Sequence, residues 1–220
     1  MARSLSQVNP REAWQPASPK IWGLRWAAHL FRRAGFGFPP RRQEDKSIAW
    51  ERLQSTVKRG QRDALERLLA FPSRPTDFDE LMDATGARIA ANSRERYSST
   101  PLAAKLQGWW LYRMLYTPHP LKERLTLFWH DHFATSVAKV KRMELMFGQN
   151  RLLRRHALTK FGPFLKAIGR DPAMVLWLDS NSNVQGKPNE NYGRELLELF
   201  SLGVGNYSEK DVQEAARAFT

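Results

Sequence analysis

Apolar residues recur at intervals of three and four along most of this chain, which is the spacing of helices with one buried face. Proline and glycine interrupt the pattern at the points where such helices would begin and end. The pattern therefore predicts an all-α protein, a multi-helix globular array of about eight to ten helices with no significant sheet.

The two ends of the chain differ from its middle. Residues 1–20 contain three prolines and little periodicity, which predicts an extended N-terminal arm. Residues 21–220 are predicted to form a single helical domain. Ser208 and Asp211 are spaced as an N-cap and its acidic partner, and the helix they begin is still running at Thr220. We therefore expect the domain to be truncated at its C-terminal end.

The clearest element is the helix predicted for residues 189–202. Asn189 is suited to cap its first turn, and Gly203 is suited to end it. One side of the helix is apolar and the other is charged; the charged side carries Glu190, Arg194, Glu195 and Glu198. The plainest interpretation of that side is a ladder of ion pairs on a solvated surface.

A second amphipathic helix, predicted for residues 121–134, carries two histidines. Side chains two positions apart on a helix point roughly 160° apart, so His130 and His132 cannot bind one metal ion there. His132 shares its side with Leu125 and Phe128. Because a buried imidazole needs a polar partner, we expect the acidic side of the 189–202 helix to supply one.

Such a meeting of helices would build a metal-assisted or acid–base hydrolytic site between residues 121–134 and 189–202. In this hypothesis Glu190 or Glu195 is the base or a metal ligand, and His132 carries protons. Arg194 or Arg33 would hold an anion. The alternative is a non-catalytic helical scaffold or partner-binding module, in which the same residues form a buried polar lock.

The loop before the 189–202 helix resembles a calcium-binding loop in its spacing. Counted from Asp179, oxygen-bearing side chains fall at positions one, three and five, which are Asp179, Asn181 and Asn183, and Glu190 falls at position twelve. Position six, which should be glycine, is Val184, so the match is partial. The loop is a candidate Ca²⁺ site, and its other interpretation is ordinary turn sequence.

Charge and composition limit which other classes of function the chain could have. The formal net charge of +13 suggests acidic partners, and nucleic-acid binding through basic residues 139–160 is a lesser alternative. Their cations distribute around the predicted helix, which argues against a groove that follows phosphates. Without cysteine there are no disulfides or thiolate sites. No apolar run of about eighteen residues and no signal sequence is present, so the chain as written is expected in the cytoplasm.

Four stretches together resemble a bacterial family known as domain of unknown function 1800: HLFRRAGFG at 29–37, ERLTLFWHDHFATS at 123–136, DPAMVLWLD at 171–179 and the block 186–220. The resemblance implies that this chain is an N-terminal portion, because members look about twice as long. It also implies a sulfatase-like partner and, for longer relatives, export, although this chain has no export signal. It assigns no catalytic residue. Its motif positions are His29, Arg33, His132, Asn189, Glu190, Arg194 and Glu195.

Overall fold

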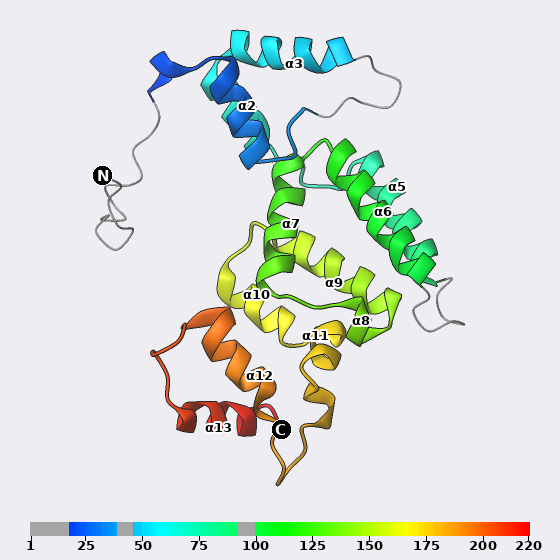
Figure 1. The fold of residues 1–220 in the computed structure, drawn as a ribbon, viewed down its shortest axis with the longest axis vertical. Helices are drawn as coiled ribbons and strands as arrows, with labels where there is room; N and C mark the ends of the chain where they lie inside the picture. The colour runs from blue at the N-terminus through cyan, green and yellow to red at the C-terminus, as the bar shows by residue number, and fades with distance from the viewer. Residues whose placement is uncertain (1–17, 39–45, 92–99) are drawn as a thin grey trace. The chain divides into compact units, whose positions relative to one another are not determined.

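A computed structural model describes residues 18–38, 46–91 and 100–220 of the chain (Figure 1). Twelve α-helices and no strand occur within these ranges, so the all-α prediction is confirmed. The predicted arm at residues 1–20 lies almost wholly outside the described residues and stays a prediction. No helix in the described ranges is both long and apolar enough to cross a membrane.

The described residues form two compact units that divide between Ala70 and Phe71, and each unit is described by itself. The first contains α2 (Leu24–Arg33), α3 (Lys46–Arg59) and α4 (Gln61–Leu69). Gly60 separates α3 from α4 with φ of 94°, a backbone conformation that favours glycine. The indole N–H of Trp22 donates to the Val57 carbonyl at 3.3 Å, which ties the start of the unit to α3.

The second unit contains the remaining nine α-helices. They are α5 (Asp77–Ala91), α6 (Thr100–Tyr116), α7 (Pro120–His132), α8 (Val137–Val140), α9 (Met143–His156), α10 (Phe161–Ile168), α11 (Pro172–Trp177), α12 (Glu190–Glu195) and α13 (Glu209–Ala218). Pro120 and Pro172 lie at helix starts, where a missing N–H costs nothing. The helix that begins with α12 continues as a π-helical segment, η4 (Leu196–Ser201).

Two apolar clusters hold this unit together, and α9 contributes to both. One joins α5, α6 and α9 around Trp109 and Phe147, whose rings meet edge to face at 5.3 Å. The other joins the end of α7 to α9, α10, α11 and α12 around Phe133 and Phe164. α9 also buries three polar residues, Gln149, Asn150 and Arg154.

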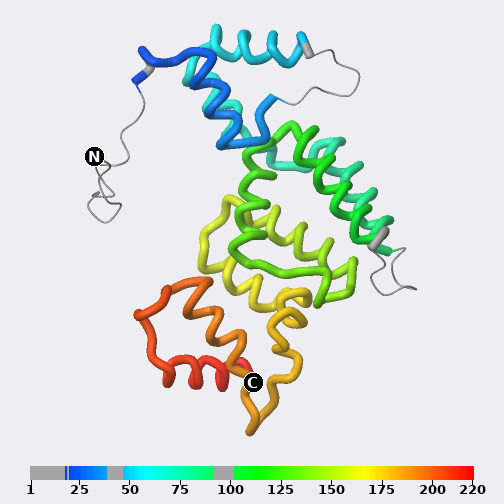
Figure 2. Tube along the Cα trace, viewed as in Figure 1, coloured from blue at the N-terminus to red at the C-terminus, as the bar shows by residue number. Residues whose placement is uncertain are grey.

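The end of the described chain is a pair of packed helices, α12 and α13, which lie side by side in Figures 1 and 2. The side chain of Asn189 caps α12 by accepting a hydrogen bond from the Asn191 N–H at 2.9 Å. A side chain at Gly193 would lie 3.1 Å from the Ala216 nitrogen, so glycine permits the close crossing of the two helices. Gly203, with φ of 83°, follows the last turn as predicted.

Candidate functional site

His132 lies at the end of α7 among aromatic rings. Its ring centroid is 4.6 Å from that of Phe133, and Phe161 and Phe200 also lie close to it. Its Nε2 is 3.4 Å from the Phe200 carbonyl oxygen. Within the described ranges no carboxylate is hydrogen-bonded to this ring. The structure therefore brings His132 to the apolar side of the 189–202 helix, at its C-terminal end.

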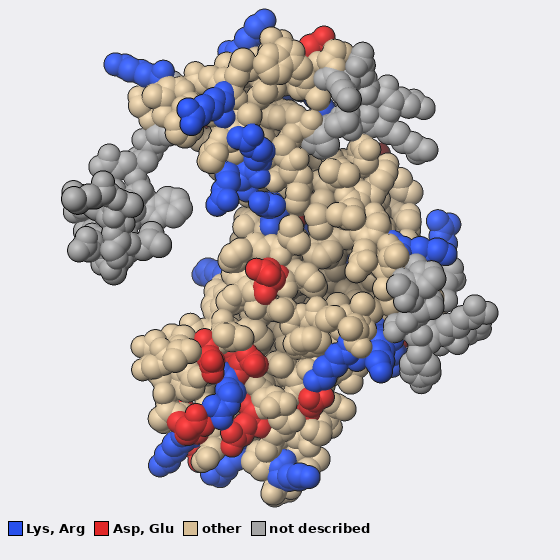
Figure 3. All heavy atoms as spheres, viewed as in Figure 1, with Lys and Arg blue, Asp and Glu red and all other residues tan. Residues whose placement is uncertain are grey.

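The charged side of that helix lies on the surface with α13 (Figure 3). Arg194 Nη2 donates to Glu190 at 3.1 Å and to Glu209 at 2.8 Å, and Nη1 donates to Glu209 at 2.9 Å. Glu198 accepts a hydrogen bond from the Tyr207 hydroxyl at 2.7 Å. Partial burial, together with the neighbouring Glu198, raises the pKa of the Glu195 carboxyl. Apart from that shift, these contacts are those of a solvated ion-pair network.

The loop between α11 and α12 uses its polar side chains to hold itself in place. Asp179 Oδ2 accepts a hydrogen bond from Lys139 Nζ at 2.7 Å, and Asn183 Oδ1 accepts one from the Asn189 N–H at 2.9 Å. Asn181 is exposed. In the part of the chain that the structure describes, no three His, Cys, Asp or Glu side chains are grouped as a metal site would need. Calcium binding by this loop stays a prediction.

The most deeply buried carboxylate belongs to Glu123 of α7, which is 1% exposed. Arg113 Nε donates to it at 2.6 Å, and Arg154 donates to its two oxygens through Nε at 2.5 Å and Nη2 at 3.1 Å. Trp110 Nε1 also donates to the Glu123 carboxylate, at 3.3 Å. These donors come from α6 and α9, so one carboxylate ties three helices together. We call Glu123, Arg113 and Arg154 the Glu123 lock.

Arg113 extends the Glu123 lock to a fourth helix, α5. Its Nη2 donates to Asp79, and its Nη1 donates to Asp83 at 3.4 Å. Asp79 is itself held by Thr76, whose N–H and hydroxyl donate to it at 3.1 and 2.8 Å. All three guanidinium nitrogens of Arg113 are therefore paired, although the residue is only 2% exposed.

Burial and neighbouring charges shift the carboxylate pKa values at this site in opposite directions. Burial alone would raise the pKa of Glu123, but Arg154 and Arg113 outweigh it and hold that pKa below its ordinary value. At Asp79 the hydrogen bonds from Thr76 and the charge of Arg113 likewise outweigh burial and lower the pKa. Both carboxylates are consequently ionised at neutral pH, which the buried arginines require.

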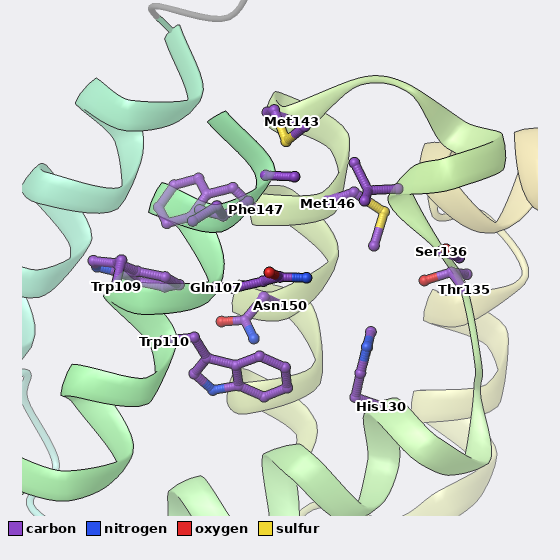
Figure 4. A pocket seen from close by; sticks show the side chains of 13 residues that line it. Gln107, Trp109, Trp110, His130, Thr135, Ser136, Met143, Met146, Phe147 and Asn150 are labelled. Atoms are coloured by element: carbon purple, nitrogen blue, oxygen red, sulfur yellow. The ribbon is translucent and has the colours of Figure 1, made fainter. Parts of the chain in front are cut away.

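A pocket of about 280 Å³ lies beside the lock, between α6, α7 and α9 (Figure 4). Its wall is mainly apolar, and its polar groups come from Gln107, His130, Thr135, Ser136 and Asn150. Trp110 and His130 meet edge to face at 5.2 Å. Burial lowers the pKa of His130, which leaves the imidazole neutral at pH 7.

The Glu123 lock positions two residues of this pocket. Trp110 is held by its hydrogen bond to Glu123, and Asn150 Oδ1 accepts a hydrogen bond from Arg154 Nη2 at 2.6 Å. His130 and His132 thus face different surroundings, as their helical spacing predicts. The pocket is apolar, has a few fixed polar groups and is partly preorganised, and these are the general features of small-molecule sites.

The sequence interpretation missed the Glu123 lock, although one signal was present. Arg113 is the only charged residue between Lys105 and Lys122, in a run of Trp, Leu, Tyr and Met. A lone cation in such a run is typical of a buried ion pair, because an unpaired one would be costly. Arg154 gave no comparable signal, since it is one of several cations in its segment.

Several basic residues of 139–160 are taken up by contacts within the protein. Lys139 pairs with Asp179, and Arg142 pairs with Glu144 at 2.5 Å, whereas Arg154 is buried in the lock. Arg33 is exposed at the end of α2 in the first unit, and its role as an anion clamp stays a prediction.

The chain was compared with known families, curated proteins and solved structures. A family described as "Protein of unknown function (DUF1800)" matches residues 29–220. No curated protein and no solved structure matches the chain. The matched range includes α7, α9 and α12, and with them the Glu123 lock, the pocket beside it and the predicted site residues. This chain therefore belongs to the DUF1800 family.

Proposed function

We propose that this chain is a helical binding module whose pocket beside His130 takes a small, largely apolar ligand with one hydrogen-bonding group. The observation that carries the proposal is the coupling of the pocket to the Glu123 lock. Trp110 and Asn150 line the pocket, and each is hydrogen-bonded to a member of the lock. Ligand binding then requires little ordering of the wall, which favours affinity.

The wall suggests the chemistry of the ligand. Trp109, Met143, Met146 and Phe147 offer apolar and polarisable surface, which suits a planar ring. A neutral imidazole at His130 can donate or accept one hydrogen bond. At about 280 Å³ the pocket suits a fragment-sized molecule. The Glu123 lock has a structural role in this proposal, and no catalytic step is assigned to it.

Indole is a suitable probe, because it is planar and has one N–H donor. In ¹H–¹⁵N NMR spectra of the whole chain, added indole should shift the Trp110 indole resonance in a saturable way. His130→Phe should remove the shift, since it replaces the imidazole and narrows the pocket. His156→Phe is the matched control, because His156 is also a half-buried histidine but does not line the pocket. No saturable shift in the wild type, or equal loss in both variants, would contradict the proposal.

A second candidate is the acid–base hydrolytic site at His132 and Glu195, and one observation favours it. The raised pKa of Glu195 is the kind of shift that general acids and bases carry. Hydrolysis of 4-nitrophenyl esters by the whole chain tests it, with Glu195→Gln and His132→Ala as variants. Activity that survives both changes would remove this candidate. Arg194, which contacts Glu209 and Glu190, would then have only a structural role.

Calcium binding at Asp179, Asn181, Asn183 and Glu190 is tested separately. A bound ion stabilises the folded state by mass action, so Ca²⁺ should raise the melting temperature and Asp179→Asn should reduce that rise. A melting temperature that does not respond to Ca²⁺ would rule the site out.

A further inference from the structure

A second cavity in the same unit differs from the His130 pocket in charge. Its volume is about 270 Å³, and it is lined by the segment before α5 and by α5, α6, α7 and α9. Six of its lining residues are cations: Arg74, Arg113, Lys122, Arg151, Arg154 and Arg155. Only two are acidic, Asp79 and Asp83. The cavity is therefore basic even when Glu123 is counted with it.

The acidic groups nearby are already used by the Glu123 lock and its extension. Arg113 contacts all three carboxylates, and Arg154 shares Glu123 with it. The side chains of Arg74 and Arg155 make no hydrogen bond or ion pair with any described residue. Lys122 makes no side-chain hydrogen bond there and acts on Asp79 only through its charge. Three lining cations thus have no direct anionic partner in the described part of the chain.

One buried donor is also left without an acceptor. Arg154 lines the cavity, yet its Nη1 is buried with no hydrogen-bond partner among the described residues. The Trp109 ring lies 5.8 Å from Cζ and offers an aromatic face but no lone pair. A buried charged donor without an acceptor is costly, and an anion held in the cavity would offset part of that cost through its charge.

The distribution of the cations favours a small anion over a polymer as the ligand. Two other cations of residues 139–160 are engaged elsewhere, since Lys139 pairs with Asp179 and Arg142 with Glu144. What remains is a group of cations around one cavity, drawn from α6, α7, α9 and the segment before α5. Clustered guanidinium groups match the oxygen geometry of phosphate and sulfate. We propose that this cavity binds a small molecule through a tetrahedral oxyanion, as a phosphate or sulfate group.

The test is isothermal titration calorimetry of the whole chain at low ionic strength. The probes are inorganic phosphate, inorganic sulfate and glycerol 2-phosphate, with glycerol as the uncharged control. The variant is Arg74→Gln with Arg155→Gln, because both side chains are exposed and outside the Glu123 lock. The matched control is Lys166→Gln with Lys210→Gln, which removes the same charge from exposed positions outside the cavity.

We expect at least one oxyanion to bind with one-to-one stoichiometry, and the cavity variant to weaken it by about tenfold or more. The control variant should change the affinity for the oxyanion by less than about twofold. Tighter binding of the ester than of both inorganic ions would identify an organic phosphate as the ligand class, and equal binding would identify the free oxyanion. Glycerol should not bind.

Three results would overturn the proposal. They are no binding of any oxyanion to the wild type, equal losses in the cavity and control variants, and binding of single-stranded DNA that outcompetes every small anion and depends equally on both pairs of cations. The proposal can fail independently of the proposed function at the His130 pocket. We expect indole to bind the Arg74→Gln, Arg155→Gln variant as it binds the wild type.

Discussion

Replacing Glu123 by glutamine removes one charge from the centre of the lock while keeping the size of the side chain. Two arginines then remain buried with less compensation. Arg113 keeps the carboxylates of Asp79 and Asp83, but Arg154 keeps no carboxylate partner among the described residues. Breaking one partner of a buried pair typically costs about 3–5 kcal/mol. Because Arg113 keeps two carboxylates, we expect the lower end, about 3 kcal/mol of unfolding free energy. That corresponds to a fall in melting temperature of roughly 6–12 °C for a chain of this size.

Urea unfolding followed by tryptophan fluorescence and by far-ultraviolet circular dichroism measures this loss. Glu190→Gln is the matched control, because its side chain is 40% exposed and its partner Arg194 keeps Glu209. An exposed pair of this kind contributes about 0–1 kcal/mol. A double-mutant cycle with Arg154→Gln isolates the interaction between the two lock residues. If Glu123→Gln costs no more unfolding free energy than Glu190→Gln, the buried carboxylate contributes no more than an exposed one.

Acid should weaken the folded state through Glu123: a pKa held below 4.5 stabilises the protein above that pH, and the contribution disappears as pH falls through the folded-state pKa. Between about pH 6 and pH 3, urea titrations should show that the unfolding free energy of Glu123→Gln falls less steeply than that of the wild type. NMR titration should give His130 a pKa below 6.5, because burial disfavours its charge. In urea titrations Gly86→Ala should cost about 1–3 kcal/mol, since its Cβ would lie 2.8 Å from an indole carbon, whereas Gly108→Ala, with open space, should gain about 0.5–1 kcal/mol. By the same assay Asn189→Ala should cost about 1–2 kcal/mol through the lost cap of α12.

Each of these outcomes can fail on its own. An acid profile that Glu123→Gln leaves unchanged would separate the lock from acid stability. A His130 pKa at or above 6.5 would mean that the imidazole is solvated. Equal effects at Gly86 and Gly108 would contradict the close packing at the first, and an unchanged stability in Asn189→Ala would contradict its capping role.

The helices were predictable because their signals are local. Asn189, Gly203, and the pair Ser208 and Asp211 mark helix ends, and each acts in the structure within a few residues of its own position. The capping box at Ser208 forms with both of its hydrogen bonds. Local chemistry of this kind does not depend on which helices later pack together.

The candidate site was less predictable because packing partners are not local. A histidine on an apolar face does not reveal which part of another helix it meets, and His132 meets the Phe200 carbonyl. The Glu123 lock joins residues that are 10 and 31 positions apart in the chain. Its one sequence signal, the isolated Arg113, indicates that a buried carboxylate exists but not which one.

Hydrogen exchange read by mass spectrometry tests most directly whether the Glu123 lock holds α5, α6, α7 and α9 as one unit. In the wild type, amides of these four helices should exchange together and more slowly than those of α13. In Glu123→Gln the amide protection of these four helices should fall together, while the protection of α13 should stay the same. Unchanged protection in α7 and α9, or a loss in α13 as large as theirs, would mean that the Glu123 lock does not hold the four helices together.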